Sequence, residues 1–181
     1  MRRYLGGILV GGQARRLGGQ PKGLITVDQS SLINRSIEAL TPYCDDIVLL
    51  GSAVDYAHLN LSALPDVYPD SGPLSGLAAA LDATNHEVLV VPCDLPYIDA
   101  SVFSKLVQAP SGHPLGCKGP KRTHPLIARY PKSAAPMIHK FAQMQGSVHD
   151  AFEACNGRWI KFESERPFTN VNTPEEVAQL A

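Results

Sequence analysis

Short apolar runs alternate along the chain with longer stretches in which apolar residues recur every three or four positions. The short runs are typical of buried strands, and the recurring spacing is typical of amphipathic helices. Residues 112–120 are predicted to form a loop. Strands are predicted over residues 4–10, 45–51, 87–91, 123–130 and 158–164, and helices over residues 31–40, 74–84, 99–107, 132–145, 147–155 and 173–181. This alternation predicts a three-layer, Rossmann-like α/β fold with a mainly parallel central sheet.

Residues suited to cap helices stand where several of these helices should begin. Ser31, Asp99 and Ser147 each precede a helical pattern and can accept a hydrogen bond from an unpaired backbone N–H group. Near the end of the chain, Thr173-Pro174 followed by Glu176 combines a cap, a proline suited to the first turn and a capping-box carboxylate. The starts of these four helices are therefore predicted with a physical reason.

Length and composition predict a single folded domain over residues 1–181. A chain of 181 residues with 44% hydrophobic and 18% charged residues can bury a core of ordinary size. The net charge of −1 provides no global attraction to nucleic acid or to an anionic membrane surface, so neither partner is expected. Any anion-binding surface must then be local.

The cysteines and the hydropathy predict a cytoplasmic location. The four cysteines, Cys44, Cys93, Cys117 and Cys155, form no Cys-x-x-Cys pair, so a zinc site is not expected. No basic and apolar leader and no bilayer-length apolar run are present in the sequence. Reduced thiols in the cytoplasm are the expected state.

The segment "GILVGGQARRLGGQPKG", residues 7–23, predicts a phosphate-binding loop at the carboxyl end of the first strand. Glycines let backbone N–H groups approach a ligand closely, and nearby cations can neutralise a polyphosphate. The segment matches neither the P-loop nor the Gly-x-Gly-x-x-Gly fingerprint. A surface turn with chance cations is the alternative. The residues concerned are Gly11, Gly12, Gly18, Gly19, Arg15, Arg16 and Lys22.

Asp94 is the second candidate, because it follows the buried strand 87–91 at the same predicted edge of the sheet. A carboxylate placed there can hold Mg²⁺ together with phosphate oxygens, although a turn ahead of Pro96 would also use an aspartate. Asn170 and Asn172 can serve as helix caps or ligand contacts. The sequence offers no Gly-x-Ser-x-Gly elbow and no nucleophile paired with a base, so covalent hydrolysis is not expected.

Several segments together resemble a known family. The segment "ILVGGQARRLGGQPKG" resembles the Leu-Ala-Gly-Gly…Arg-Met-Gly…Lys signature of nucleotidyltransferases. The segments "YPDSGPLSGLAAAL", "VVPCDLPYI", "THPLIARY" and "FTNVNTPEEV" follow in the same order as in the molybdenum cofactor guanylyltransferases, the MobA family. The resemblance extends from residue 7 to about residue 178. It implies transfer of GMP from GTP to the terminal phosphate of molybdopterin, with Mg²⁺ as cofactor and pyrophosphate as by-product.

The resemblance also implies roles for individual residues and for partners. Arg16, Lys22 and Asp94 would be catalytic, with Asp94 also holding the metal, and Arg15 is a weaker match for the arginine. Asn170 and Asn172 would lie on the pterin side. The nucleotide would contact Leu9, Val10, Gly11, Gly12, Lys22, Asp66 and Asp94, with Asp70 as an alternative to Asp66. GTP and molybdopterin are the implied substrates, and other molybdenum cofactor assembly proteins are implied transient partners.

Two positions depart from the family pattern. Val10 replaces the usual alanine of the signature, and Ser52 stands nearest to the place where some members carry an asparagine. These departures weaken the prediction that guanine is the base more than they weaken the prediction of nucleotidyl transfer. Two alternatives therefore stay open: a molybdopterin cytidylyltransferase that uses CTP, and a non-catalytic nucleotide-binding assembly factor of the same fold.

Overall fold

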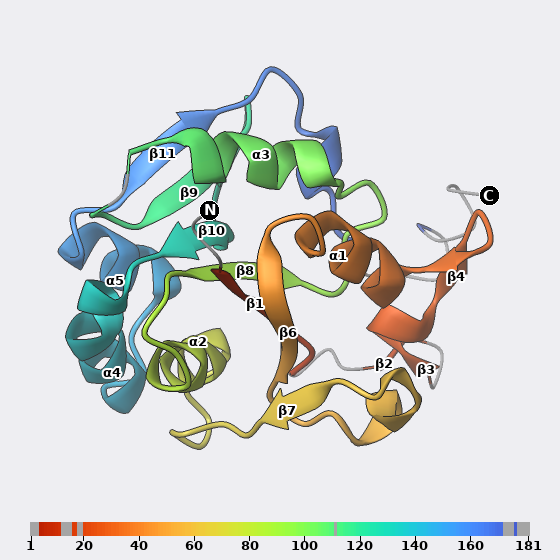
Figure 1. Ribbon diagram of the computed structural model, residues 1–181, viewed down its shortest axis with the longest axis horizontal. Coiled ribbons are helices and arrows are strands. Elements are labelled where there is room, and N and C mark those ends of the chain that lie inside the picture. Colours follow the sequence, from red (N-terminus) through yellow and green to blue (C-terminus); the bar gives the residue numbers. More distant parts are fainter. Residues whose placement is uncertain (1–3, 12–15, 18–19, 111, 172–175, 177–181) are drawn as a thin grey trace.

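The computed structural model describes residues 4–11, 16–17, 20–110, 112–171 and 176. Its central sheet has seven strands in the order β11-β9-β10-β8-β1-β6-β7 (Figure 1). The strands are β1 (Tyr4–Leu9), β6 (Cys44–Leu50), β7 (Ser62–Leu64), β8 (Val88–Pro92), β9 (Leu115–Lys118), β10 (Thr123–Tyr130) and β11 (Arg158–Lys161). Two short hairpins, β2 (Arg16–Leu17) with β3 (Gln20–Pro21) and β4 (Thr26–Val27) with β5 (Ser30–Ser31), stand apart from the sheet.

The sheet is parallel except at β10. Strand β1 pairs in parallel with β6 and β8, β6 with β7, and β11 with β9, whereas β10 runs antiparallel to both β8 and β9. The predicted mainly parallel sheet is confirmed. Because β10 is reversed, its first residues lie at the edge where the parallel strands end.

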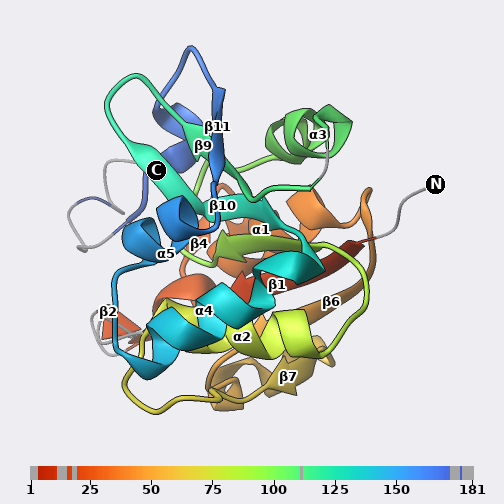
Figure 2. The ribbon, with the colours of Figure 1, turned by 90° about the vertical axis from the view of Figure 1, so that its left-hand side faces the viewer.

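Helices cover both faces of the sheet, which gives the three predicted layers (Figures 1 and 2). The helices α1 (Leu32–Leu40) and α3 (Ala100–Gln108) contribute to one buried cluster with Ile8 and Leu89. The helices α2 (Pro73–Asp82), α4 (Ala135–Gln143) and α5 (Val148–Ala154) contribute to the other with Leu9 and Val90. Alternate residues of β1 and β8 point to opposite faces, so both strands are buried on both sides. Short 3-10 helices span Lys22–Leu24, Val54–Leu59, Lys132–Ala134 and Arg166–Phe168.

The predicted caps are confirmed wherever the structure describes them. The Ser31 hydroxyl accepts a hydrogen bond from the Asn34 N–H group at 3.3 Å, and Ser147 does the same for Asp150 at 3.0 Å. Asp99 Oδ1 accepts from the Ser101 N–H group at 2.7 Å. The predicted helix start at Thr173 and Pro174 lies outside the described residues, and Glu176 is helical.

Two strands of the central sheet contradict the sequence-based expectation. Strand β9 occupies part of residues 112–120, which were predicted to be a loop. Its glycine, Gly116, packs so closely on Trp159 that a Cβ atom would lie 2.6 Å from the ring. Strand β7 was not predicted because it is an edge strand with exposed Ser62 and Ala63 and has no buried alternating pattern.

We expect Asp99→Ala to lower the free energy of unfolding by about 1 kcal/mol, because α3 loses its N-cap. For a chain of this size that corresponds to a fall of about 2–4 °C in the melting temperature. Thermal denaturation followed by circular dichroism measures it. Asp99→Asn retains a capping oxygen and should melt within about a degree of wild type. Equal losses in both variants would contradict the capping role.

Candidate active site

The parallel strands β1, β6 and β8 end side by side, and their carboxyl ends form one edge of the sheet. Leu9 is in register with Leu50 on one side and with Pro92 on the other. The Cys93 N–H group donates to the Leu9 carbonyl at 3.2 Å, which holds the chain in place just before Asp94. Ligands of open α/β sheets bind at such an edge, so this is where a site is expected.

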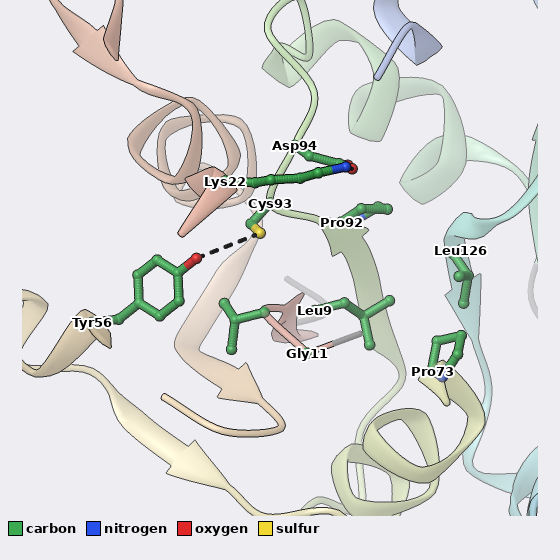
Figure 3. Close-up of a pocket in the computed structure, with 10 residues that line it drawn as sticks. Leu9, Gly11, Lys22, Tyr56, Pro73, Pro92, Cys93, Asp94 and Leu126 are labelled. Atoms are coloured by element: carbon green, nitrogen blue, oxygen red, sulfur yellow. Dashed lines mark hydrogen bonds and ion pairs between the residues drawn. The ribbon is translucent and has the colours of Figure 1, made fainter. Parts of the chain in front are cut away.

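A cavity of about 180 Å³ opens at this edge and is called the first cavity here (Figure 3). Most of its lining comes from the ends of β1 and β8, from the segment at Lys22 and from the 3-10 helix at Tyr56. The lining residues are Leu9, Val10, Gly11, Lys22, Tyr56, Pro73, Pro92, Cys93, Asp94 and Leu126. The structure therefore brings together five of the residues implied by the sequence, namely Leu9, Val10, Gly11, Lys22 and Asp94.

Lys22 and Asp94 form the charged centre of the first cavity. Lys22 follows β3 directly and is only 8% exposed, and its Nζ lies 3.8 Å from Asp94 Oδ2. Figure 3 shows both side chains reaching the same point from different elements. Burial raises the pKa of the Asp94 carboxyl, and the neighbouring Lys22 ammonium partly offsets that rise. A part-buried carboxylate beside a lysine is typical of a functional site.

A larger cavity of about 710 Å³, the second cavity, adjoins the first. Pro92, Asp94 and Leu126 line both cavities, so the Asp94 carboxylate stands where the two meet. The second cavity is also lined by Leu95, Lys121, Arg122, Thr123, His124, Pro125, Ile127, Val148, His149, Glu165, Phe168, Thr169 and Asn170. Two ligands bound in these cavities would approach each other at Asp94.

Asn170 lines the second cavity, and its role on the pterin side stays a prediction. The neighbouring Val171 is buried with Ile25, Val27 and Leu32, and its N–H group donates to the Asp94 carbonyl at 3.1 Å. The segment that carries Asn170 is therefore anchored beside Asp94. Its companion Asn172 lies outside the described residues.

Asp66 lies near Gly51 and lines neither cavity. Its Oδ2 lies 3.8 Å from the position that a Cβ atom would take at Gly51, and Gly51 in turn packs against Gly11. Gly51 has a φ of +101°, a backbone conformation that favours glycine. Asp66 therefore lies close to Gly51, which packs on Gly11 just after β1. A nucleotide contact of Asp66, or of the alternative Asp70, stays a prediction.

The glycine-rich segment is described only in part. Arg16 pairs through its backbone with Pro21 in the β2–β3 hairpin, directly before Lys22, and Gly12 lies outside the described residues. Of the predicted phosphate-binding loop, Gly11 and Lys22 line the first cavity, and Arg16 is described only through its backbone pairing. The roles of these residues stay predictions.

Sequence reasoning missed several residues that line the cavities. Tyr56 is buried beside Cys93, with its Oη 4.0 Å from the thiol sulfur, and it closes one side of the first cavity. His124 and Glu165 pair in the second cavity at 2.9 Å. Histidine in "THPLIARY" was noted as part of a motif without a role, and nothing in the sequence marked Tyr56 or Glu165.

A metal at this site would depend on Asp94. Within the described parts of the chain, no group of three or more His, Cys, Asp and Glu side chains is arranged to hold a metal ion. Mg²⁺ needs no such cage, since it is commonly bound through one or two carboxylates plus substrate phosphates. Asp94, part-buried at the junction of two cavities, fits that mode of binding.

The three-layer fold with its site at the carboxyl edge of the sheet defines a class of α/β proteins that bind ligands at that edge. Comparison with known proteins gives the family. A family model described as the MobA-like NTP transferase domain matches residues 6–157. The chain belongs to the MobA-like NTP transferase family.

Individual relatives agree with this assignment. A molybdenum cofactor guanylyltransferase from Vibrio parahaemolyticus is 32% identical over 96% of this chain and 92% of its own length. One from Haemophilus influenzae is 39% identical, but the match spans 56% of this chain and about half, 55%, of the relative. The fold resembles that of molybdopterin-guanine dinucleotide biosynthesis protein A from Archaeoglobus fulgidus, with a TM-score of 0.77 at 22% identity over 98% and 96% of the two chains. None of the described helices is long and apolar enough to cross a membrane.

Proposed function

We propose that this protein is a nucleotidyltransferase of molybdenum cofactor biosynthesis that transfers GMP from GTP to the terminal phosphate of molybdopterin. The products are molybdopterin guanine dinucleotide and pyrophosphate. The observation that carries the proposal is the Lys22–Asp94 pair, in which Asp94 lines both of two adjoining cavities. The names of the relatives support this choice of substrates.

The reaction needs no protein nucleophile. A phosphate oxygen of molybdopterin attacks the α-phosphorus of GTP, a new P–O bond forms, and the bond from that phosphorus to the oxygen bridging the α- and β-phosphates breaks. The electron pair leaves with pyrophosphate. Cys93 lies close by, but burial and the Asp94 charge raise the pKa of its thiol to about 12, so it stays protonated. Catalysis is then positioning and charge stabilisation.

The first cavity would hold the nucleotide. Leu9, Val10, Gly11 and Gly12 would present backbone groups to the base and ribose, with Asp66 behind them. The Lys22 ammonium would face the α-phosphate, where it neutralises charge that grows as the phosphoryl group transfers. Arg16 would neutralise the departing pyrophosphate.

The second cavity would hold the acceptor, with Asn170 and Asn172 on the pterin side. Asp94 would bind Mg²⁺ at the boundary. When bound there, the ion supplies Lewis-acid stabilisation of charge on the phosphate oxygens. Asp94 lines both cavities, and the nearly buried Lys22 ammonium lies 3.8 Å from its carboxylate.

A thermal-shift panel of GTP, CTP, ATP and UTP, each with and without Mg²⁺, tests the nucleotide. At about a hundred times its dissociation constant a ligand adds about 2.7 kcal/mol, which for this chain length raises the melting temperature by about 5–10 °C. We expect that shift with GTP and Mg²⁺ and none of comparable size with the other nucleotides. A shift confined to CTP would assign the protein to cytidylyl transfer, the alternative that Val10 and Ser52 left open.

Product formation tests the whole proposal. Purified protein with GTP, Mg²⁺ and molybdopterin should release pyrophosphate only when the acceptor is present, and mass spectrometry should find the dinucleotide. A protein that binds GTP but forms no product with molybdopterin would be a nucleotide-binding assembly factor instead.

A further inference from the structure

A histidine and a glutamate on separate elements meet at the wall of the second cavity. His124 lies near the start of β10, and Glu165 lies in the loop after β11. The His124 Nε2 and Glu165 Oε1 atoms are 2.9 Å apart, and the side chains are 16% and 23% exposed. Neither residue has a part in the mechanism described so far.

The imidazole ring of His124 is held from two sides. One face packs on the buried Phe168 ring, with 4.7 Å between ring centroids. Glu165 is itself fixed, because its Oε2 accepts from the Lys121 N–H group at 3.0 Å and it packs against Gly119 in the β9–β10 turn. Burial works to raise the pKa of Glu165, but hydrogen bonds from Lys121 and His124 outweigh it, so the pKa lies below its usual value. Glu165 is a carboxylate, and the Nε2–H group of His124 donates to it.

This arrangement leaves the other ring nitrogen, Nδ1, for a ligand. Within the described residues Nδ1 has no hydrogen-bond partner, and the ring lines the second cavity. Flanking Lys121 and Arg122 line the same cavity and are exposed, so the charge around the ring favours an anion.

The ring also stands close to the junction of the two cavities. Leu126 lines both cavities, and His124 precedes it by two residues on β10, which places the two Cα atoms within about 7 Å of each other. On the opposite side, the chain runs from Phe168, under the ring, to Val171, whose N–H group is bonded to the Asp94 carbonyl. An anion held by His124 would lie on the acceptor side of Asp94.

We propose that His124 binds the attacking phosphate of the acceptor through Nδ1, and that Glu165 is a positioning residue that holds Nε2 and so directs Nδ1 into the second cavity. This inference rests on the proposed function, because it assumes that a phosphate monoester occupies that cavity. A ring that carries a proton on both nitrogens would donate to Glu165 through Nε2 and to the phosphate through Nδ1.

Paired substitutions separate the two nitrogens. His124→Gln places an amide nitrogen near the position of Nε2, which keeps the contact with Glu165 and removes Nδ1. We expect the KM for molybdopterin to rise about tenfold or more, with the KM for GTP and the GTP-induced thermal shift unchanged. His124→Asn retains a donor near Nδ1 and should recover part of that loss. Glu165→Gln should raise the KM for molybdopterin by a smaller factor than His124→Gln.

The matched control is His139→Gln. His139 pairs with Asp82 at 3.0 Å in the same manner as His124 with Glu165, but it lies on α4 and lines neither cavity. Its kinetics should equal those of wild type. Kinetics of His124→Gln that equal the control, or an equal rise in both KM values, would overturn the inference.

Three further outcomes are decisive. If His124→Gln does not fold, the other two variants, Glu165→Gln and His124→Asn, decide. A rise in their KM for molybdopterin without a rise in their KM for GTP supports the inference. An unchanged KM for molybdopterin in both overturns it. If the wild-type protein forms no dinucleotide with molybdopterin, the proposed function fails and the inference falls with it. If wild type is active and the variants match it, only the inference fails.

Discussion

Replacement of Asp94 by asparagine is expected to lower the rate of dinucleotide formation by at least about a hundredfold while the fold stays intact. Asparagine has nearly the same shape, so the walls of both cavities are preserved. The charge at their junction is lost, and with it the carboxylate proposed to hold Mg²⁺. Initial rates of pyrophosphate release with GTP, Mg²⁺ and molybdopterin measure the effect, and the melting temperature without nucleotide checks the fold.

The matched control for this variant is Asp46→Asn. Asp46 is exposed and pairs with Leu5 near the opposite edge of the sheet, so its rate should equal that of wild type. The two variants should also differ in their response to metal. Mg²⁺ should add to the GTP-induced thermal shift in wild type and in Asp46→Asn but not in Asp94→Asn. A near-normal rate in Asp94→Asn would remove both the metal assignment and the catalytic role of Asp94.

The sequence predicted the elements whose cause is local. Strands β1 and β8 are buried on both faces and read as continuous apolar runs, and the caps at Ser31 and Ser147 are short-range hydrogen bonds. Strand β9 was not predicted. Its glycine, Gly116, leaves room for the ring of Trp159, a residue far along the chain. Strand β9 pairs with β10 and β11, and this long-range pairing is not visible in its local pattern.

The candidate site likewise contains residues that the local sequence predicts and residues that it does not. Lys22 stands near the end of the glycine-rich segment, and Asp94 follows a buried apolar strand. Because parallel strands end at one edge of a sheet, the sequence predicts that the two residues lie close together. Their charged atoms are 3.8 Å apart. His124 and Glu165 reach the site for a different reason. Strand β10 is inserted between β8 and β9 in the reversed direction, which brings its first residues to the carboxyl edge. Strand order and direction are not encoded in the local pattern of β10, so its contribution to the site could not be predicted.

The reversed strand also explains why two cavities meet at one carboxylate. Leu126, on β10, is the residue from that strand that lines both cavities, while Pro92 and Asp94 come from the end of the neighbouring β8. A fully parallel sheet would place the carboxyl end of a strand and its following loop at this point. With β10 reversed, the turn between β9 and β10 brings Lys121 and Arg122 to the acceptor side instead.

Lys22→Met is expected to lower the rate at saturating GTP by about a hundredfold to a thousandfold. Lys22 is nearly buried, and methionine fills a similar volume without the charge, so the packing around Tyr56 and Gly23 is kept. Removal of the Lys22 ammonium has two effects. No ammonium remains to offset charge on the α-phosphate in the transition state, and the pKa of Asp94 rises further once the cation that lowers it is gone.

The measurement is the single-turnover rate at saturating GTP and molybdopterin, so that weaker binding does not imitate slower chemistry. Lys22→Arg should recover only part of the rate, since a planar guanidinium cannot take the position of a compact ammonium in a nearly closed space. Lys161→Met, on the exposed side of β11, is the control and should match wild type. An unchanged single-turnover rate in Lys22→Met, with only the KM for GTP raised, would make Lys22 a nucleotide-binding residue and leave Arg16 and Asp94 to stabilise the transition state.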